Sequence, residues 1–194
     1  YEKIAKNEEQ YDERVRPDKA VKTTTNIPEY FEAMEPVDFA ILFGIARHPN
    51  KNDFLDELGF GDNVGDKKAN VNDITAEIAA IRPDKIIGFM SVHPDDKSVL
   101  NEVSRCKEEL NLKGIKLGPN YQNFDPLGDN AAKLYKFAEL NSLPIVFHQG
   151  TVPIPKSPLK FSYPIYMDQI AISFPQLKIV MAHMGHPWHE DCIA

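Results

Sequence analysis

Short apolar runs alternate along the chain with segments whose apolar residues recur at helical spacing. The clearest run is Pro144–Phe147, which ends in His148 and is followed two residues later by Gly150. The same pattern, again with a glycine two residues on, returns at 177–182 before His183. Uninterrupted apolar runs of this length are typical of strands that are buried on both faces of a parallel sheet. The pattern predicts five such strands, near residues 38–45, 86–92, 113–117, 144–148 and 177–182.

The segments between these strands carry apolar residues on one face of a helix. Val71, Ile74 and Ile78 show this spacing, and Asn26 offers a side-chain cap for an earlier helix. Residues 50–70 are rich in glycine, aspartate and asparagine, which predicts a long loop. Further helices are expected near residues 99–110, 131–138 and 165–174.

Strands that alternate with helices predict an α/β fold with a parallel sheet, either a barrel or an open doubly wound sheet. No Gly-x-Gly-x-x-Gly motif follows any strand, which disfavours a dinucleotide-binding fold. A (β/α)8 TIM-type barrel usually takes about 250 residues and eight strands. With five strands predicted, the chain corresponds to about five eighths of such a barrel. We expect a charged N-terminal segment over residues 1–26 and a partial barrel domain over residues 27–194.

Composition narrows the possible functions. The net charge of −7 argues against a protein that binds the phosphate backbone of nucleic acids, and no apolar run approaches the length of a membrane span. Two cysteines are too few for a disulfide framework, and Cys106 falls on the apolar face of a predicted helix. Without a signal-peptide pattern, the prediction is a cytoplasmic protein with a small-molecule substrate and no membrane or nucleic-acid partner, with a homo-oligomer left open.

The candidate chemistry lies where the strands end, because the active sites of parallel α/β sheets form at the carboxyl ends of strands. His148 and His183 end neighbouring predicted strands, so their imidazoles are expected to lie close together. Two such groups can share a divalent metal, or one can bind the metal while the other transfers a proton. The alternative is a histidine that only hydrogen-bonds to a backbone carbonyl.

Lys116 alternates with Ile115 and Leu117 in a predicted strand, which puts the lysine on the opposite face from its apolar neighbours. A buried lysine is unfavourable unless it has a partner or projects into a wet site. It can neutralise a substrate carboxylate, bridge metals as a carbamate or form a Schiff base. A purely structural ion pair at the barrel mouth is the alternative.

Other candidates lie around these strand ends. Trp188 can pack in the fold or stack on an aromatic substrate. His186 and His189 are expected at the surface. His48 and His93 both precede proline and are interpreted mainly as turn residues, with His93 the better placed to approach the site.

Three stretches together resemble the amidohydrolase superfamily, in the branch of metal-dependent hydrolases and decarboxylases known as amidohydrolase 2. They are Gly114–Leu117, Pro144–Gly150 and Phe174–Trp188. The resemblance implies a (β/α)8 barrel with a divalent metal, commonly zinc. It implies that His148 is a metal ligand, that His183 activates water or substrate or binds a second metal, and that Lys116 is carbamylated or lines the substrate pocket.

The sequence departs from the family pattern in two ways. It contains no His-x-His pair of the kind found on the family's first strand. It also lacks the later strand that carries the family's last metal-binding aspartate. We therefore expect an incomplete barrel that lacks the first strand and the last two.

The resulting prediction is a metal-dependent hydrolase or non-oxidative decarboxylase. Its substrate is expected to be small and carboxylated, with aromatic and cyclic compounds among the options. His148 is the predicted metal ligand, His183 the catalytic residue, and Lys116 and Trp188 the substrate-binding residues. A Schiff-base lyase that uses Lys116 and a non-catalytic truncated barrel that acts as a binding module are the alternatives.

Overall fold

The computed structural model describes residues 26–50, 54, 70–152, 154 and 156–194. Five parallel strands form one sheet in the order β1-β2-β3-β4-β5. Sequential order distinguishes a barrel from a doubly wound sheet, in which the strand order reverses at a switch point. The positions of the five predicted strands are thus confirmed: β1 (Ala40–Phe43), β2 (Ile86–Ser91), β3 (Ile115–Leu117), β4 (Ile145–His148) and β5 (Ile179–Ala182). Burial on both faces, as predicted, holds for β2, β3 and β4, whereas β1 and β5, at the two edges of the sheet, are partly exposed.

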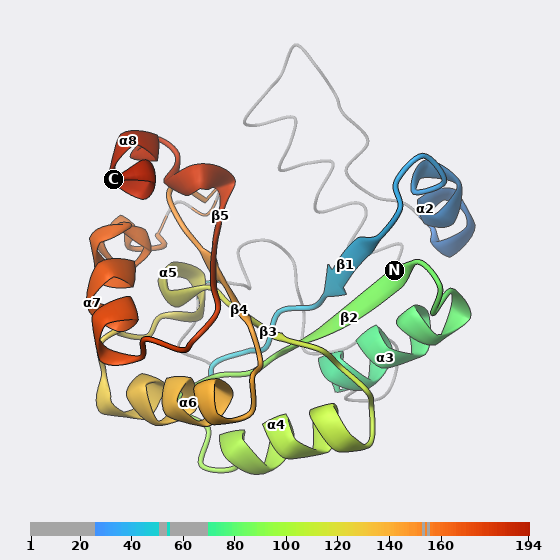
Figure 1. Ribbon diagram of the computed structural model, residues 1–194, viewed down its shortest axis with the longest axis horizontal. Helices are drawn as coiled ribbons and strands as arrows, with labels where there is room; N and C mark the ends of the chain where they lie inside the picture. Colours follow the sequence, from blue (N-terminus) through green and yellow to red (C-terminus); the bar gives the residue numbers. More distant parts are fainter. Residues whose placement is uncertain (1–25, 51–53, 55–69, 153, 155) are drawn as a thin grey trace.

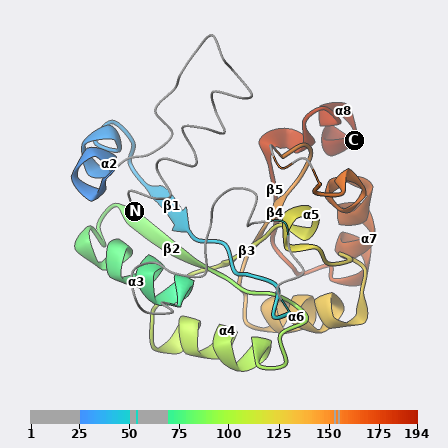
Figure 2. The ribbon, with the colours of Figure 1, turned by 180° about the vertical axis from the view of Figure 1, so that it is seen from behind.

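Helices cover one face of this curved sheet, as Figure 1 and Figure 2 show. Following the strands along the chain, α3, α4, α6 and α7 form an outer arc, while the concave face of the sheet stays on the inside. This arrangement is half of a TIM-type barrel. The helices are α2 (Ile27–Ala33), α3 (Val71–Ile81), α4 (Val99–Glu108), α5 (Pro119–Gln122), α6 (Asp129–Leu140), α7 (Ile165–Ser173) and α8 (His189–Ile193), with short 3-10 turns η2 (Leu159–Ser162) and η3 (His183–Gly185).

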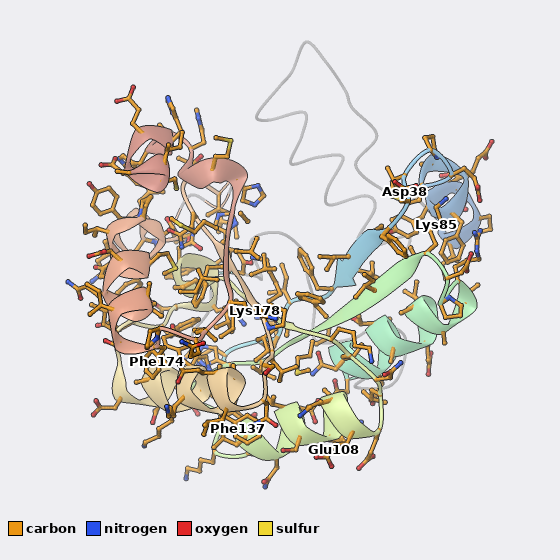
Figure 3. All side chains as sticks on the ribbon, viewed as in Figure 1. Asp38, Lys85, Glu108, Phe137, Phe174 and Lys178 are labelled. Atoms are coloured by element: carbon orange, nitrogen blue, oxygen red, sulfur yellow. The ribbon has the colours of Figure 1, made fainter. Side chains whose placement is uncertain are left out.

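The main hydrophobic core lies between the sheet and the outer helices. The ring of Tyr135 on α6 packs edge-on against Phe147 of β4 and against Phe174, which lies beside α6 in Figure 3. Cys106 of α4 is fully buried in this core, as predicted, and burial raises the pKa of its thiol to about 12. Leu134 is buried in the same cluster.

The amino end of the sheet is held by α2. Asn26 caps this helix as predicted, because its side chain accepts a hydrogen bond from the backbone N–H of Glu29 at 2.9 Å. Asp38 and Lys85, just before β1 and β2, lie beside α2 in Figure 3. The ammonium group of Lys85 donates to the backbone carbonyl of Glu35 at 2.8 Å, which ties α2 to the start of β2.

A series of hydrogen bonds connects the outer helices to β3. Glu102 of α4 accepts from the side-chain amide of Asn72 on α3 at 2.8 Å, and Asn72 accepts from the backbone N–H of Ser91 at 2.8 Å. The Ser91 hydroxyl then donates to the carbonyl of Lys116 at 3.1 Å. Since all of these groups but Glu102 are buried, they fix where β3 lies relative to both helices.

Two predicted segments lie outside the described residues. The predicted charged segment 1–26 lies there apart from Asn26, and so does nearly all of the predicted loop 50–70. The division of the chain after residue 26 stays a prediction. Among the described residues, no helix combines the length and the apolar character needed to cross a membrane.

Core packing along α6 leads to a first prediction. Leu134→Ala removes a fully buried side chain and leaves a cavity, so the free energy of unfolding should fall by about 2–5 kcal/mol. Leu140→Ala, six residues on in the same helix, is the matched control, because Leu140 is 72% exposed and its loss should change stability by less than about 0.5 kcal/mol. Urea denaturation of both variants measures the difference, and equal losses would contradict this core.

Candidate functional site

The carboxyl ends of the five strands gather at one edge of the half-barrel, because all the strands run in the same direction. His148 is the last residue of β4 and pairs in register with Ala182, the last residue of β5. His183 follows directly, and its ring centroid lies 4.7 Å from that of His148, with the planes inclined at 61°. The structure therefore brings the two predicted imidazoles into direct contact.

The ring of His148 is buried and held in one orientation. Its Nε2 lies 3.2 Å from the carbonyl oxygen of Thr151. Because a carbonyl oxygen only accepts hydrogen bonds, Nε2 carries the proton and the lone pair remains on Nδ1. Burial is the main cause that lowers the pKa of His148 to about 3, and the nearby charges of Lys116 and His183 add to it. The imidazole is therefore neutral at pH 7, as a metal ligand must be.

His183 is more exposed and has an unusual backbone. Its φ angle is +61°, and the next residue, Met184, is also left-handed at +48°. Residues other than glycine rarely adopt this conformation, and such strain is common at functional sites. Partial burial and the charge of Lys116 lower the pKa of His183. A neutral imidazole that remains open to solvent can accept a proton.

Lys116 lies on β3, and its side chain is buried. Its Nζ lies 5.5 Å from the ring centroid of Phe43 and 5.7 Å from that of Tyr121, and it donates to the carbonyl of Leu117 at 3.0 Å. Burial lowers the pKa of Lys116 to about 7. Within the described part of the chain, no carboxylate lies within ion-pair distance of Nζ, so the structural alternative finds no partner there.

Tyr121 joins these groups, and sequence reasoning missed it. Its ring centroid lies 5.2 Å from that of His148, and the same ring contacts Lys116. Tyr121 lies on the short helix α5, whose four residues are too few to give a periodic pattern. The proline at the start of α5, Pro119, is the one signal that marks it.

Gln122, the next residue, connects three of the strand ends. Its side-chain amide donates to the carbonyls of Ala46 and Val92 at 2.9 and 3.1 Å, and its side-chain oxygen accepts from the N–H of Gly118 at 2.7 Å. Every one of these contacts lies just beyond a strand. Gln122 thus fixes the loops after β1, β2 and β3 around the site.

Three further candidates, at positions 186, 188 and 189, follow His183 along the chain. Trp188 packs edge-on against Tyr163, with ring centroids 5.1 Å apart, and its substrate-binding role stays a prediction. His186 and His189 are exposed, as expected for surface residues. The Nδ1 of His189 lies 3.1 Å from the carbonyl of Pro187, two residues earlier in the sequence.

His48, His93 and Asp95 form a second cluster, whose possible ligand atoms lie within 4.8 Å of one another. The predicted turn role of both histidines is confirmed, because each Nδ1 accepts from the backbone N–H two residues on, that of Asn50 or Asp95. The Nε2 of His93 also donates to the carbonyl of Gln122 at 2.9 Å. Since both of its ring nitrogens are in hydrogen bonds, His93 could bind a metal only by losing one of them.

Comparison with solved structures identifies the fold. An uncharacterised TIM-barrel protein from Bordetella bronchiseptica matches with a TM-score of 0.67 and 17% sequence identity, over 98% of this chain and 61% of that chain. The 4-oxalomesaconate hydratase of Rhodopseudomonas palustris matches with a TM-score of 0.59 and 17% identity, over 97% of this chain and 62% of that one.

A third structure contains a metal. The 5-carboxyvanillate decarboxylase of Novosphingobium aromaticivorans, complexed with manganese and 4-hydroxy-3-methoxy-5-nitrobenzoic acid, matches with a TM-score of 0.60 and 21% identity. The match covers 82% of this chain and 50% of that chain. These likenesses confirm the predicted barrel fold, and the chain spans less than two thirds of the length of each structure.

The sequence itself gives the family. No curated protein matches the chain. The family model described as amidohydrolase, in contrast, matches residues 31–194, which include every strand and all of the candidate site residues. The predicted resemblance is therefore confirmed, and the chain belongs to the amidohydrolase family.

Proposed function

We propose that this chain carries part of the active site of a metal-dependent hydrolase or non-oxidative decarboxylase that acts on a small carboxylated compound. One observation carries the proposal. At the carboxyl end of the sheet, two neutral imidazoles 4.7 Å apart share their surroundings with one buried lysine. Family membership and the decarboxylase and hydratase structures of similar fold support an enzyme of this kind.

Lys116 is the group that we propose for binding the substrate carboxylate. Its ammonium lies between the rings of Phe43 and Tyr121, where little water screens its charge. A carboxylate that enters this space gains a charge-assisted hydrogen bond, and an aromatic ring attached to it can pack against the same two side chains. This environment supports a carboxylated aromatic substrate.

His148 is the proposed metal ligand. The donor chemistry fits, because Thr151 holds the proton on Nε2 and leaves the Nδ1 lone pair available. His183 supplies a second imidazole beside it. Zinc is the predicted ion, and manganese is the ion in the similar decarboxylase structure. When bound, a divalent metal supplies a Lewis acid that polarises an oxygen of the substrate or of water. Catalytic zinc sites usually hold three protein ligands, so His148 is only one member of a complete set.

His183 is the proposed proton-transfer residue. Its lowered pKa keeps the ring neutral at pH 7, so it can take a proton from water in hydrolysis or from an acidic group of the substrate in decarboxylation. Once protonated, the same ring returns the proton to the leaving group or to the carbon that loses carbon dioxide. Its exposure gives it access to both water and substrate.

The lowered pKa of Lys116 also favours a second candidate function. A lysine with a pKa of about 7 is neutral often enough to form a Schiff base with a carbonyl substrate. Borohydride reduction in the presence of pyruvate distinguishes the two. A hydrolase or decarboxylase of the proposed kind should show no mass gain at Lys116, whereas a lyase would carry the reduced adduct there.

His183 gives a direct test of the proposed reaction. In the intact enzyme with its metal, His183→Ala should leave the metal content near normal and lower turnover by at least about a hundredfold, because proton transfer loses its carrier. Release of carbon dioxide from substituted benzoates such as 5-carboxyvanillate measures turnover, with hydrolysis of small carboxylated amides as the parallel assay. His189→Ala is the matched control, since that imidazole is exposed and its hydrogen bond to Pro187 lies within its own turn. Unchanged turnover in His183→Ala would refute the role.

Lys116 gives a test of substrate recognition that does not depend on turnover. Lys116→Met keeps most of the side-chain volume and removes the charge, so binding of a benzoate should weaken by at least about tenfold. In the native protein the lysine is charged below its pKa of about 7 and neutral above it, so affinity should fall as the pH rises through 7.

Calorimetric titration with 4-hydroxy-3-methoxy-5-nitrobenzoic acid between pH 6 and pH 8.5 measures both effects. The methionine variant should lose this pH dependence together with the affinity. An identical affinity and pH profile in the two proteins would show that Lys116 does not bind the carboxylate.

A further inference from the structure

The loops that follow β4 and β5 are joined by a backbone hydrogen bond. The N–H of Thr151 donates to the carbonyl oxygen of His186 at 2.8 Å. On the β5 side, the N–H of His186 donates to the carbonyl of His183 at 3.2 Å, which closes the turn that carries the second imidazole. A short path of hydrogen bonds therefore runs from Thr151 to the backbone of His183.

Thr151 also holds the first imidazole. Its carbonyl oxygen accepts from Nε2 of His148. The N–H and the carbonyl of one residue thus contact the two segments that carry the imidazoles. Displacement of Thr151 would change the orientation of His148 and the position of the His183 turn together.

Gly150 is what allows this close approach. A Cβ atom at position 150 would lie 2.1 Å from the carbonyl oxygen of His186 and 2.7 Å from the carbonyl carbon of Gly185, far inside van der Waals contact. These are backbone atoms, so they can move away only if the turn itself moves. The φ angle of Gly150 is +81°, a left-handed value that disfavours a side chain independently of the contact.

The β4 loop is itself anchored on its other side. The N–H of Gly150 donates to the carbonyl of Ser162 at 2.9 Å, and the Ser162 hydroxyl donates to the carbonyl of Gly150 at 2.7 Å. Ser162 is fully buried at the end of η2. Because Gly150 is held at both its N–H and its carbonyl, it cannot shift to make room for a larger side chain.

We propose that Gly150 and Thr151 are positioning residues, which together form a backbone clamp that sets the separation of the His148 and His183 rings and fixes which nitrogen of His148 carries its proton. The inference rests on the proposed function of these two imidazoles and adds residues that act by positioning them. Catalysis is sensitive to such placement, since an error of about 1 Å in the position of a catalytic group can lower the rate about a hundredfold.

Gly150→Ala tests the clamp. The added methyl should push the His183 turn away, so turnover should fall by at least about tenfold. Gly128→Ala is the matched control, because Gly128 has an ordinary φ of −70° and its Cβ would come no closer than 3.2 Å to another atom. The control should keep turnover within about twofold of the native enzyme.

A second measurement separates positioning from a general loss of structure. Long-range proton–nitrogen NMR at pH 8 identifies which imidazole nitrogen is protonated. The native chain should show His148 protonated at Nε2 alone, whereas Gly150→Ala should show a mixture of both tautomers. Other core resonances should stay in place. A single Nε2 tautomer together with native turnover in Gly150→Ala would overturn the proposal.

If Gly150→Ala does not fold, the clamp can be tested with a variant in which an ester bond replaces the peptide bond between Gly150 and Thr151. The ester removes the N–H of Thr151 and adds no side chain, so only the bond to His186 is lost. It should also lower turnover by at least about tenfold, and native turnover in a folded ester variant would overturn the clamp. The NMR result does not depend on catalysis, so a change of tautomer with an inactive native enzyme would count against the proposed function and not against the clamp.

Discussion

Parallel strand pairing is the constraint on which the site depends. Because all five strands run the same way, their carboxyl ends lie on one edge, and residues distant in sequence meet there. The register between β4 and β5 is the most important part, since it sets His148 opposite Ala182 and therefore beside His183. A slip of one residue would turn His148 toward the helices, because side chains alternate between the two faces of a strand. The apolar core under β4, with Phe147 against Tyr135, opposes such a slip.

Burial at this edge gives the polar groups their chemistry. The same loss of solvent that makes a buried charge unfavourable lowers the pKa of Lys116 to about 7 and that of His148 to about 3. His148 therefore stays neutral and can bind a metal, while Lys116 lies near the point at which it gains or loses its charge. An incoming carboxylate favours the charged form of Lys116, so binding and protonation of this lysine reinforce each other.

The sequence allowed much of this fold to be predicted, because buried parallel strands and amphipathic helices have strong periodic patterns. His148, His183 and Lys116 could be identified since each interrupts or ends an apolar run. Tyr121, Gln122 and the contact between Gly150 and His186 could not. They depend on how a four-residue helix and two irregular turns approach one another in space, and no local periodicity records that. Gly150 itself was visible in the sequence, but only the backbone shows that the carbonyl of His186 occupies the place of a side chain.

Two residues that sequence reasoning missed each hold a different group of loops at the mouth of the half-barrel. Gln122 fixes the loops after β1, β2 and β3, and Thr151 fixes the loops after β4 and β5. Tyr121, adjacent to Gln122, reaches across to the ring of His148 and so links the two groups of loops. The loops around Lys116 are thus held by the contacts of Gln122, and the loops around the two imidazoles by those of Thr151. The ring of Tyr121 contacts both Lys116 and His148. Because α5 supplies both the glutamine and this ring, a helix of four residues determines how Lys116 and the two imidazoles face each other.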